Sequence, residues 1–131
     1  MKLTSRGRYA LPAMLDLLHN SAGKAIKLKT ISDRQGIPLN YLSQLFRKLC
    51  MNGVVKSVRG PGGGYVLGKL PNEITVKEVL LHAGELTDYN STIYTDDAST
   101  DEQRAVSVYF TSLDKIVEDF LSKTLDQLHE E

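Results

Sequence analysis

Two groups of residues in the first half of the chain are of types that bind nucleic acids, and the first is a helix-like segment. In IPLNYLSQLFRKLCMNG (residues 37–53), the apolar residues recur at the spacing of one buried helical face. The polar residues on the other side are Asn40, Tyr41, Ser43, Gln44, Arg47 and Lys48. Because amides pair with adenine edges and arginine pairs with guanine, this face could contact bases in a DNA major groove. We expect Asn40, Tyr41, Ser43, Gln44 and Arg47 to face bases.

The second group is the glycine-rich stretch SVRGPGGGYVLGK (residues 57–69), which holds five glycines and a proline between two short apolar runs. Glycine permits a positive φ and a close approach to another backbone. Such a stretch could be a phosphate-binding loop of a nucleotide-binding protein, a flexible linker, or a tight turn between two strands. Its central residues are Arg59, Gly60, Pro61, Gly62, Gly63 and Gly64.

Spacing excludes the first two of these hypotheses. A Walker motif requires Ser or Thr after Gly-Lys, whereas Leu70 follows Lys69. A dinucleotide fingerprint fails because Tyr65 or Leu67 occupies the third glycine position. A linker would lack the flanking apolar runs, and Pro61 stiffens the middle. The remaining interpretation is the wing of a winged helix, with Arg59 at its base in reach of a DNA minor groove.

The zero net charge of the 131-residue chain hides a strong asymmetry. Residues 1–70 carry 12 basic and 2 acidic side chains, a balance of +10, whereas residues 71–131 carry 4 basic and 14 acidic ones, a balance of −10. The alternative is a surface that is unevenly charged by chance, but the split coincides with a change in sequence pattern. It indicates that the first half meets a polyanion. The basic residues that we expect on DNA phosphates are Lys2, Arg6, Arg8, Lys48 and Lys56.

Apolar periodicity and turn residues predict a mainly α-helical fold with a small β-wing. We expect helices over residues 5–20, 28–36, 37–53 and 75–86, and strands over 54–58 and 65–69. Pro12 conflicts with the first helix, which either begins later or is kinked there. The segment from 87 to about 103 is polar and acidic and is predicted to be a loop. The predicted organisation is a winged helix-turn-helix domain (1–83), a loop (84–101) and a long C-terminal helix (102–131).

The last predicted helix, from about residue 102 to 128, carries a sustained apolar stripe without an obvious partner in the chain. We therefore predict that it forms a dimer with a second copy. The alternative is that it packs back onto its own domain. The residues expected in the dimer interface are Val106, Tyr109, Phe110, Leu113, Ile116, Val117, Phe120 and Leu121.

Several function classes are disfavoured by what the sequence contains. No apolar stretch approaches the length of a membrane helix, and the first residues do not follow the pattern of a signal peptide. The single cysteine, Cys50, cannot form an internal disulfide and suits the cytoplasm. No nucleophile–base pair or metal-ligating cluster can be placed on regular structure, so we do not expect an enzyme. The rival hypothesis to DNA binding is a protein-interaction module built on a degenerate winged helix.

Three blocks of the sequence, MKLTSRGRYALPAMLDL, ISDRQGIPLNYLSQLFRKL and VVKSVRGPGGGYVLGK, resemble the BadM/IscR/Rrf-two family of bacterial transcription regulators. The resemblance covers residues 1–83 well, weakens through the loop and returns in pattern for the last helix. It implies a homodimeric winged helix-turn-helix repressor or activator on palindromic operators, with residues 39–52 as the recognition helix. Where the family has a member with an acidic residue that tunes site choice, this chain has Ser43, which leaves the operator preference open.

The family's iron–sulfur members hold their cluster with three cysteines in the loop before the long helix, and this chain departs from that pattern. Residues 84–105 contain no cysteine, and their acidic residues are hard oxygen ligands that suit a cluster poorly. We therefore expect no iron–sulfur cofactor and no other metal. The expected partners are double-stranded DNA, a second copy of the chain and a small-molecule or protein effector, with no membrane.

Overall fold

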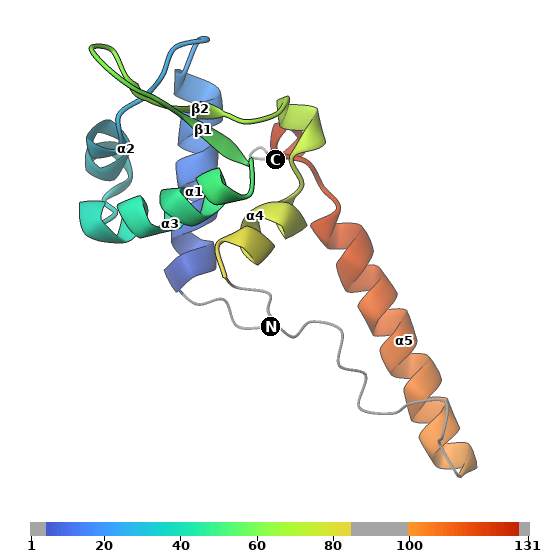
Figure 1. Ribbon diagram of the computed structural model, residues 1–131. Coiled ribbons are helices and arrows are strands. Elements are labelled where there is room, and N and C mark those ends of the chain that lie inside the picture. The colour runs from blue at the N-terminus through green and yellow to red at the C-terminus, as the bar shows by residue number, and fades with distance from the viewer. Residues whose placement is uncertain (1–4, 85–99, 129–131) are drawn as a thin grey trace.

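The first three helices pack together in the upper part of the structure as Figure 1 shows it. The computed structural model describes residues 5–84 and 100–128. Helix α1 spans Ser5–Asn20, α2 spans Leu28–Gln35 and α3 spans Leu39–Met51. Helix α1 continues through Pro12, so the alternative of a later start is wrong. The cost of an internal proline, about 3 kcal/mol, is offset by the burial of the apolar face that surrounds it.

The turn between α2 and α3 is fixed by backbone and side-chain hydrogen bonds. Gly36 ends α2 in the left-handed conformation (φ 66°), as its type predicts. The Ile37 amide donates to the Ser32 carbonyl at 3.2 Å, and the Ser32 hydroxyl donates to the Ile37 carbonyl. Pro38 then precedes the first turn of α3, where its missing N–H costs nothing. The two helices therefore form a helix-turn-helix.

Two short antiparallel strands follow α3. Strand β1 spans Val55–Val58 and β2 spans Gly64–Leu67, with Val55 opposite Leu67 and Val58 opposite Gly64. The free edge of β2 is bridged by Ile26, whose amide and carbonyl both bond to Tyr65 at 2.9 and 2.8 Å. The predicted wing is confirmed, and the bridge ties it to the segment that leads into α2.

The core lies where α1, α3, the wing and the following helix meet. Helix α4 spans Val76–His82 and begins at Thr75, whose hydroxyl accepts from the Glu78 amide at 3.0 Å. The helix predicted over 75–86 is thus shorter, because the chain leaves it through Gly84 at φ 92°. Residues with no solvent exposure in the core are Ala10, Ala13, Met14, Leu17, Ile31, Leu42, Phe46, Leu49, Val54, Val55, Ile74, Val79, Ala83 and Leu125.

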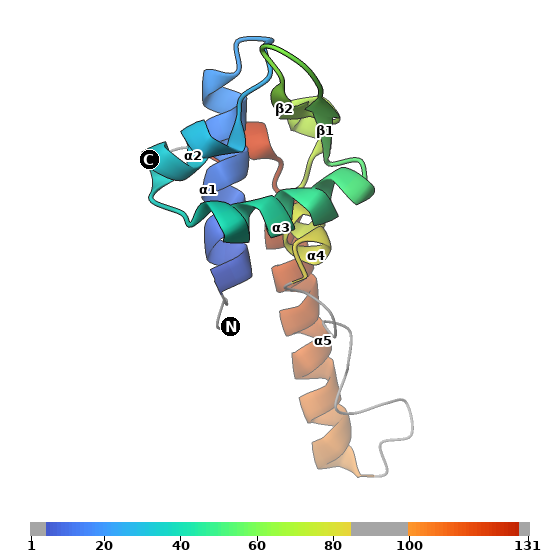
Figure 2. The same ribbon diagram turned by 60° about the vertical axis from the view of Figure 1, so that its left-hand side comes forward.

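Helix α5 spans Asp101–Leu121 and projects from the winged domain, as two views of the ribbon show (Figures 1 and 2). It ends seven residues earlier than predicted. After it the chain returns to the domain and forms a bridge between Thr124 and Thr75. The Val76 amide donates to the Lys123 carbonyl at 2.8 Å, and the Leu125 amide donates to the Ile74 carbonyl at 2.9 Å. The segment after α5 is therefore part of the winged domain.

The end of α5 also packs on its own domain. Leu121 is 3 % exposed and contacts the cluster around Leu80 of α4, and half-buried Val117 joins the same cluster. Lys77 of α4 bonds both carboxylate oxygens of Glu118 at 2.9 and 2.8 Å. The alternative hypothesis for the last helix thus holds for its C-terminal end. Leu121, which was predicted to lie in a dimer interface, is buried within its own chain.

Candidate nucleic-acid interface

Helix α3 has one face in the core and one in solvent. Leu42, Leu45, Phe46 and Leu49 are at most 2 % exposed. Four predicted base contacts are exposed, and they are Asn40, Ser43, Gln44 and Arg47. Since all apolar anchors lie on the opposite side, the exposed face is free to enter a groove while the core holds the helix in place.

Tyr41, the fifth predicted base contact, has a different position. Its side chain is half-buried, and its ring meets Tyr9 of α1 edge to face with the centroids 5.2 Å apart. Such aromatic pairs add to packing beyond the area that they bury. Tyr41 therefore lies at the flank of α3 that faces α1, beside the exposed face rather than at its centre.

The tip of the wing is a tight turn. The Gly63 amide donates to the Gly60 carbonyl at 2.9 Å, with Pro61 and Gly62 between them and Gly62 at φ 74°. This combination of proline, then glycine at positive φ, is that of a type II turn. Arg59 directly precedes the turn and is exposed, as are Gly60, Pro61 and Gly62.

The remaining wing glycines are required by contacts inside the protein. A β-carbon on Gly63 would lie 2.4 Å from the Val58 carbonyl oxygen, and one on Gly64 would lie 2.3 Å from the Ile26 carbonyl oxygen. Gly63 is buried and Gly64 is the first residue of β2. The sequence pattern predicts that the wing glycines serve a tight turn and a close approach to the DNA backbone. For these two, the structure gives close packing within the chain as the cause.

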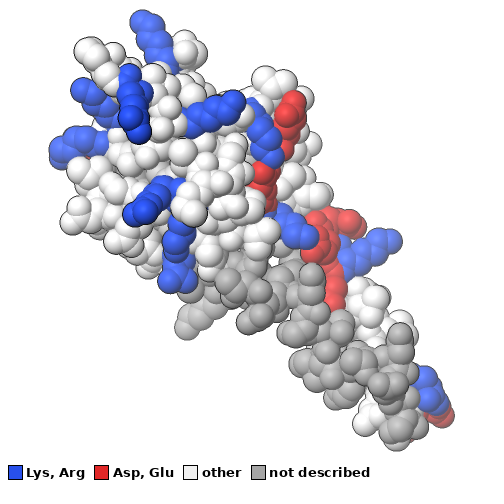
Figure 3. All heavy atoms as spheres, viewed as in Figure 1, with Lys and Arg blue, Asp and Glu red and all other residues white. Residues whose placement is uncertain are grey.

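Ion pairing leaves the helix-turn-helix and wing with a large surplus of positive charge. Within residues 5–84, Asp16, Asp33 and Glu78 each hold a basic partner. The basic residues of this range without an acidic partner in the described part of the chain are Arg6, Arg8, Lys24, Lys27, Arg47, Lys48, Lys56 and Arg59. Figure 3 shows basic side chains spread over the winged domain, whereas acidic ones lie along its right-hand edge, at its junction with α5 and at the far end of α5.

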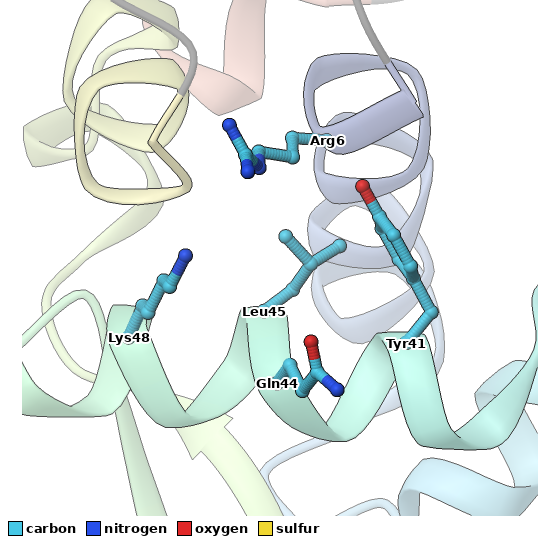
Figure 4. Close-up of a pocket in the computed structure, with 5 residues that line it drawn as sticks. All are labelled: Arg6, Tyr41, Gln44, Leu45 and Lys48. Atoms are coloured by element: carbon cyan, nitrogen blue, oxygen red, sulfur yellow. The ribbon is translucent and has the colours of Figure 1, made fainter. Parts of the chain in front are cut away.

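The predicted phosphate contacts are distributed over several elements. Arg8 on α1 and Lys56 on β1 are exposed. Arg6 and Lys48 line a hollow of about 100 Å³ between α1 and α3, together with Tyr41, Gln44 and Leu45 (Figure 4). Lys2 lies outside the described residues.

A buried ion pair that sequence analysis missed fixes α2 against α1. Asp16 is 3 % exposed, and Arg34 donates to both its carboxylate oxygens at 2.9 and 2.6 Å. Gln35 adds a third bond at 2.8 Å. Burial alone would raise the pKa of Asp16, but the bonds from Arg34 and Gln35 outweigh it and hold that pKa below its usual value. One signal was available, because Asp16 is one of only two acidic residues in the first 70.

Helix α5 carries a contrasting surface of exposed apolar side chains. The exposed members of the predicted dimer set are Val106, Tyr109, Leu113, Ile116 and Phe120, at 37 to 68 %. Phe110 is half-buried. In the described part of the chain no other element presents so many large apolar residues to solvent. An apolar surface of this kind usually marks an interaction site.

This combination of helix-turn-helix, glycine-rich wing and projecting helix has close counterparts among known proteins. The profile of the Rrf2 family, described as iron-dependent transcriptional regulators, matches residues 3–131. The chain belongs to the Rrf2 family. It is 44% identical over 129 residues to the HTH-type transcriptional regulator IscR of Pectobacterium carotovorum, a match that covers 98% of this chain and 79% of that protein. Against IscR of Escherichia coli O1:K1 it is 56% identical over 88 residues, 67% of this chain and 54% of the other.

Solved structures agree with the sequence comparison. CymR, the global cysteine regulator of B. subtilis, superposes with a TM-score of 0.77 at 31% identity, covering 96% of this chain and 94% of CymR. IscR of T. potens gives a TM-score of 0.74 at 28% identity, over 100% and 94% of the two chains. The protein is thus a winged helix-turn-helix transcriptional regulator of the Rrf2 family, which is not a family of enzymes. None of the helices in the described residues is long and apolar enough to cross a membrane.

The family description refers to iron, but the donor atoms of this chain differ from those of an iron–sulfur site. Iron–sulfur clusters are held mainly by thiolates. Cys50 is the one cysteine in the sequence, and it lies on α3 packed against the hydrophobic core. The described residues contain no group of three or more His, Cys, Asp or Glu side chains that could hold a metal ion. A thiolate-bound cluster therefore does not fit the residues of this chain.

Proposed function

We propose that this regulator binds operator DNA as a homodimer, with α3 in the major groove and the wing against the adjacent minor groove. One observation carries the proposal. The exposed polar face of α3 and the wing lie in the part of the molecule where the basic residues have no acidic partners. Neutralising phosphates would release counterions and so supply affinity.

Base recognition in this proposal belongs to the exposed face of α3. The major groove admits one helix and presents a distinct pattern for each base pair. Gln44 would pair with an adenine edge and Arg47 with guanine or a phosphate, while Asn40 and Ser43 stand near the start of the helix. Recognition helices usually contact bases with their N-terminal residues, which agrees with this arrangement.

Minor-groove recognition belongs to Arg59. The type II turn begins directly after Arg59 and reverses the chain within four residues. The exposed side chain of Arg59 can therefore extend from the wing into a groove. Narrow A·T-rich minor grooves concentrate negative potential and attract arginine. The wing would thereby add a preference for groove shape to the base contacts of α3.

The exposed apolar face of α5 supports the dimer. Two copies that bury Tyr109, Ile116 and Phe120 against each other would remove this surface from water. A two-fold dimer presents two equivalent α3 helices, so the operator would be an imperfect palindrome with half-sites about 34–36 Å apart. In this proposal the dimer needs no iron–sulfur cluster, since the chain lacks a set of thiolate ligands.

Selection of bound DNA from random fragments tests the proposal. We expect a palindrome, and affinity for it should fall steeply between 50 and 200 mM salt. Gln44→Ala should relax choice at one base position by about 1–3 kcal/mol, whereas Arg59→Ala should weaken binding most where the minor groove is narrow. Equal losses on selected and random DNA in both variants would contradict the assigned roles. A protein that selects no sequence would favour a protein-interaction module.

The dimer is tested separately with two charge substitutions on α5. Ile116→Glu places a carboxylate on the apolar face, where the residue is 66 % exposed. Thr111→Glu is the matched control on the opposite side of the same helix. Sedimentation equilibrium should give a monomer for Ile116→Glu alone, with operator affinity reduced on the order of 100-fold through lost avidity. A dimeric Ile116→Glu variant would refute this use of α5.

A further inference from the structure

The hollow between α1 and α3 combines two cations with a hydroxyl group. Arg6 enters it from α1, and Lys48 and Tyr41 enter it from α3, where Gln44 stands at the rim (Figure 4). In the close-up the Tyr41 hydroxyl and the Lys48 ammonium both extend toward the side on which Arg6 lies. All three groups donate hydrogen bonds, and two of them carry positive charge. The donors favour an anion.

The surroundings of Gly84 give an upper limit on the distance between the two cations. A β-carbon built on this glycine would lie 3.7 Å from Lys48 Nζ and 4.0 Å from Arg6 Nε. Since both nitrogens are within 4.0 Å of one point, they are within about 8 Å of each other. Two like charges at this distance repel each other unless an anion lies between them. The acidic residues that the structure describes do not neutralise this pair of cations.

No acidic residue that the structure describes is ion-paired with either cation of the hollow. The lining of the hollow contains no Asp or Glu. Asp16 is bound by Arg34, Asp33 by Lys29 and Glu78 by Lys69. Within the described ranges neither Arg6 nor Lys48 forms an ion pair. Both cations are therefore available to an anion from outside these ranges.

We propose that this hollow receives one backbone phosphate of the operator, at the edge of the groove that α3 enters. The inference rests on the proposed function, because the hollow flanks the exposed face of α3. Arg6 would bind the phosphate through its planar guanidinium, Lys48 would act as a point charge, and Tyr41 would donate a neutral hydrogen bond. The site fixes the position of α3 along the groove. It also assigns Tyr41, which sequence analysis placed on a base, to the phosphate.

Gly84, which has no side chain, lies beside both cations of this hollow. A β-carbon at this position would make only an ordinary van der Waals contact with Arg6 Cδ, at 3.6 Å, so packing alone does not require glycine here. Gly84 is at φ 92°, a conformation that side chains rarely adopt. Glycine is therefore favoured by the backbone conformation with which the chain leaves α4, beside the two cations.

The test pairs protein variants with DNA in which single phosphates are neutralised. Full-length Arg6→Gln and Lys48→Gln are titrated against the selected operator and against copies carrying one methylphosphonate at each position in turn. Each variant should bind the native operator about tenfold more weakly, as expected for one charge-assisted hydrogen bond. With the methylphosphonate at the contacted phosphate, wild type and both variants should bind equally. Lys115→Gln, on the opposite side of α5 from its apolar face, is the control for loss of one charge.

The outcomes separate this inference from the proposed function. If Arg6→Gln and Lys48→Gln couple to different phosphates, or lose no more affinity than Lys115→Gln, the single site is overturned while DNA binding stands. If wild type selects no DNA, both proposals fail. Both variants should unfold at the same or a higher temperature than wild type, since repulsion is relieved; a lower temperature would indicate a structural role and contradict the site.

A free anion is the other source of the same chemistry. Inorganic phosphate is titrated at constant ionic strength while the Gly84 amide is followed by NMR. Shifts that saturate at low millimolar phosphate, together with phosphate that competes with operator DNA, would assign the hollow to a small anion and overturn the DNA assignment. Shifts that appear only on addition of operator, and are lost with the neutralised phosphate, support it.

Discussion

Helices α3 and α5 are both amphipathic, but α3 buries its apolar face in its own domain whereas α5 exposes most of its apolar face to solvent. The apolar face of α3 is closed off by its own chain, with Phe46 and Leu49 fully buried. The apolar face of α5 is in solvent over most of its length, and Phe120 is 68 % exposed. A periodic apolar stripe therefore indicates that a helix packs against something. It does not indicate whether that partner is the helix's own domain or another molecule. In α3 the polar face is left for a ligand, and in α5 it is the apolar face.

The difference extends to charge. The positions around α3 carry cations without acidic partners, whereas α5 begins with two acidic residues and is ion-paired to α4 through Glu118. A polyanion is attracted to the first surface and repelled from the second. One chain thus separates a basic surface from an exposed apolar surface, and the separation follows the +10 and −10 halves of the sequence.

The largest effect is expected from a matched pair of phenylalanine substitutions. Phe46→Ala removes a fully buried ring and should lower the free energy of unfolding by about 3–5 kcal/mol, because it leaves a cavity in the core. Phe120→Ala should change the unfolding free energy of the monomer by less than about 0.5 kcal/mol, because its ring is mostly in solvent. Urea denaturation at low protein concentration measures both. Equal losses would break the comparison between the two helices.

The second prediction concerns the segment after α5, which returns to the winged domain. Leu125→Ala should cost about 2–5 kcal/mol of unfolding free energy, since Leu125 is fully buried in the same core as Phe46. Gln127→Ala, in the same turn, removes only an exposed capping hydrogen bond from the Thr124 amide and should cost less, about 1 kcal/mol. Deletion of residues 102–131 should accordingly unfold the winged domain as well as remove α5. A truncated chain with cooperative unfolding near the wild-type midpoint would contradict this.

The third prediction concerns the ion pair that holds α2 against α1. Asp16 has a lowered pKa in the folded protein, so its contribution to stability is present above its unfolded value, near 3.8, and is lost as the pH falls below that value toward the folded pKa. Asp16→Asn should lower stability by about 1–3 kcal/mol at neutral pH. The difference between wild type and variant should shrink below about pH 4. Urea titrations from pH 2 to 7 measure it, and a constant difference would exclude the ion pair as the cause.

The smallest effect is expected in the wing. Gly62→Ala should cost about 1–2 kcal/mol, because φ 74° is unfavourable for alanine although nothing lies within 4 Å of the new methyl. Pro61→Ala, one residue earlier, should cost less than 1 kcal/mol through the unfolded chain. Hydrogen exchange of the Gly63 amide reports on the turn. Faster exchange in Pro61→Ala than in Gly62→Ala would contradict the type II assignment.

Much of the fold could be predicted because local signals and tertiary structure agree. Gly36, Pro38 and the apolar spacing of 37–53 predicted the helix-turn-helix, and the glycines at 60–64 predicted the wing. The end of α5 could not be predicted from periodicity. Leu125 continues the apolar spacing of the helix, but hydrogen bonds to Ile74 and Val76 draw the chain into a bridge instead. A contact between residues some 50 positions apart leaves no local trace.

The candidate site was predictable in type and less so in detail. The exposure of Asn40, Gln44 and Arg47 followed from the helical period. The position of Tyr41 did not, because it depends on the contact with Tyr9 on another helix. The position of Gly84 beside Arg6 and Lys48 depends on how three separate segments pack together, which no spacing along the chain predicts.

The return of the chain after α5 has a consequence for the order of events during synthesis. The core of the winged domain is completed by Leu125, which follows α5 in the chain. A nascent polypeptide therefore cannot close that core until the whole of α5 has been made, because one of the core's fully buried side chains arrives last. The core of the winged domain and the exposed apolar face of α5 are therefore completed together. No stage of translation yields a finished winged domain that lacks α5.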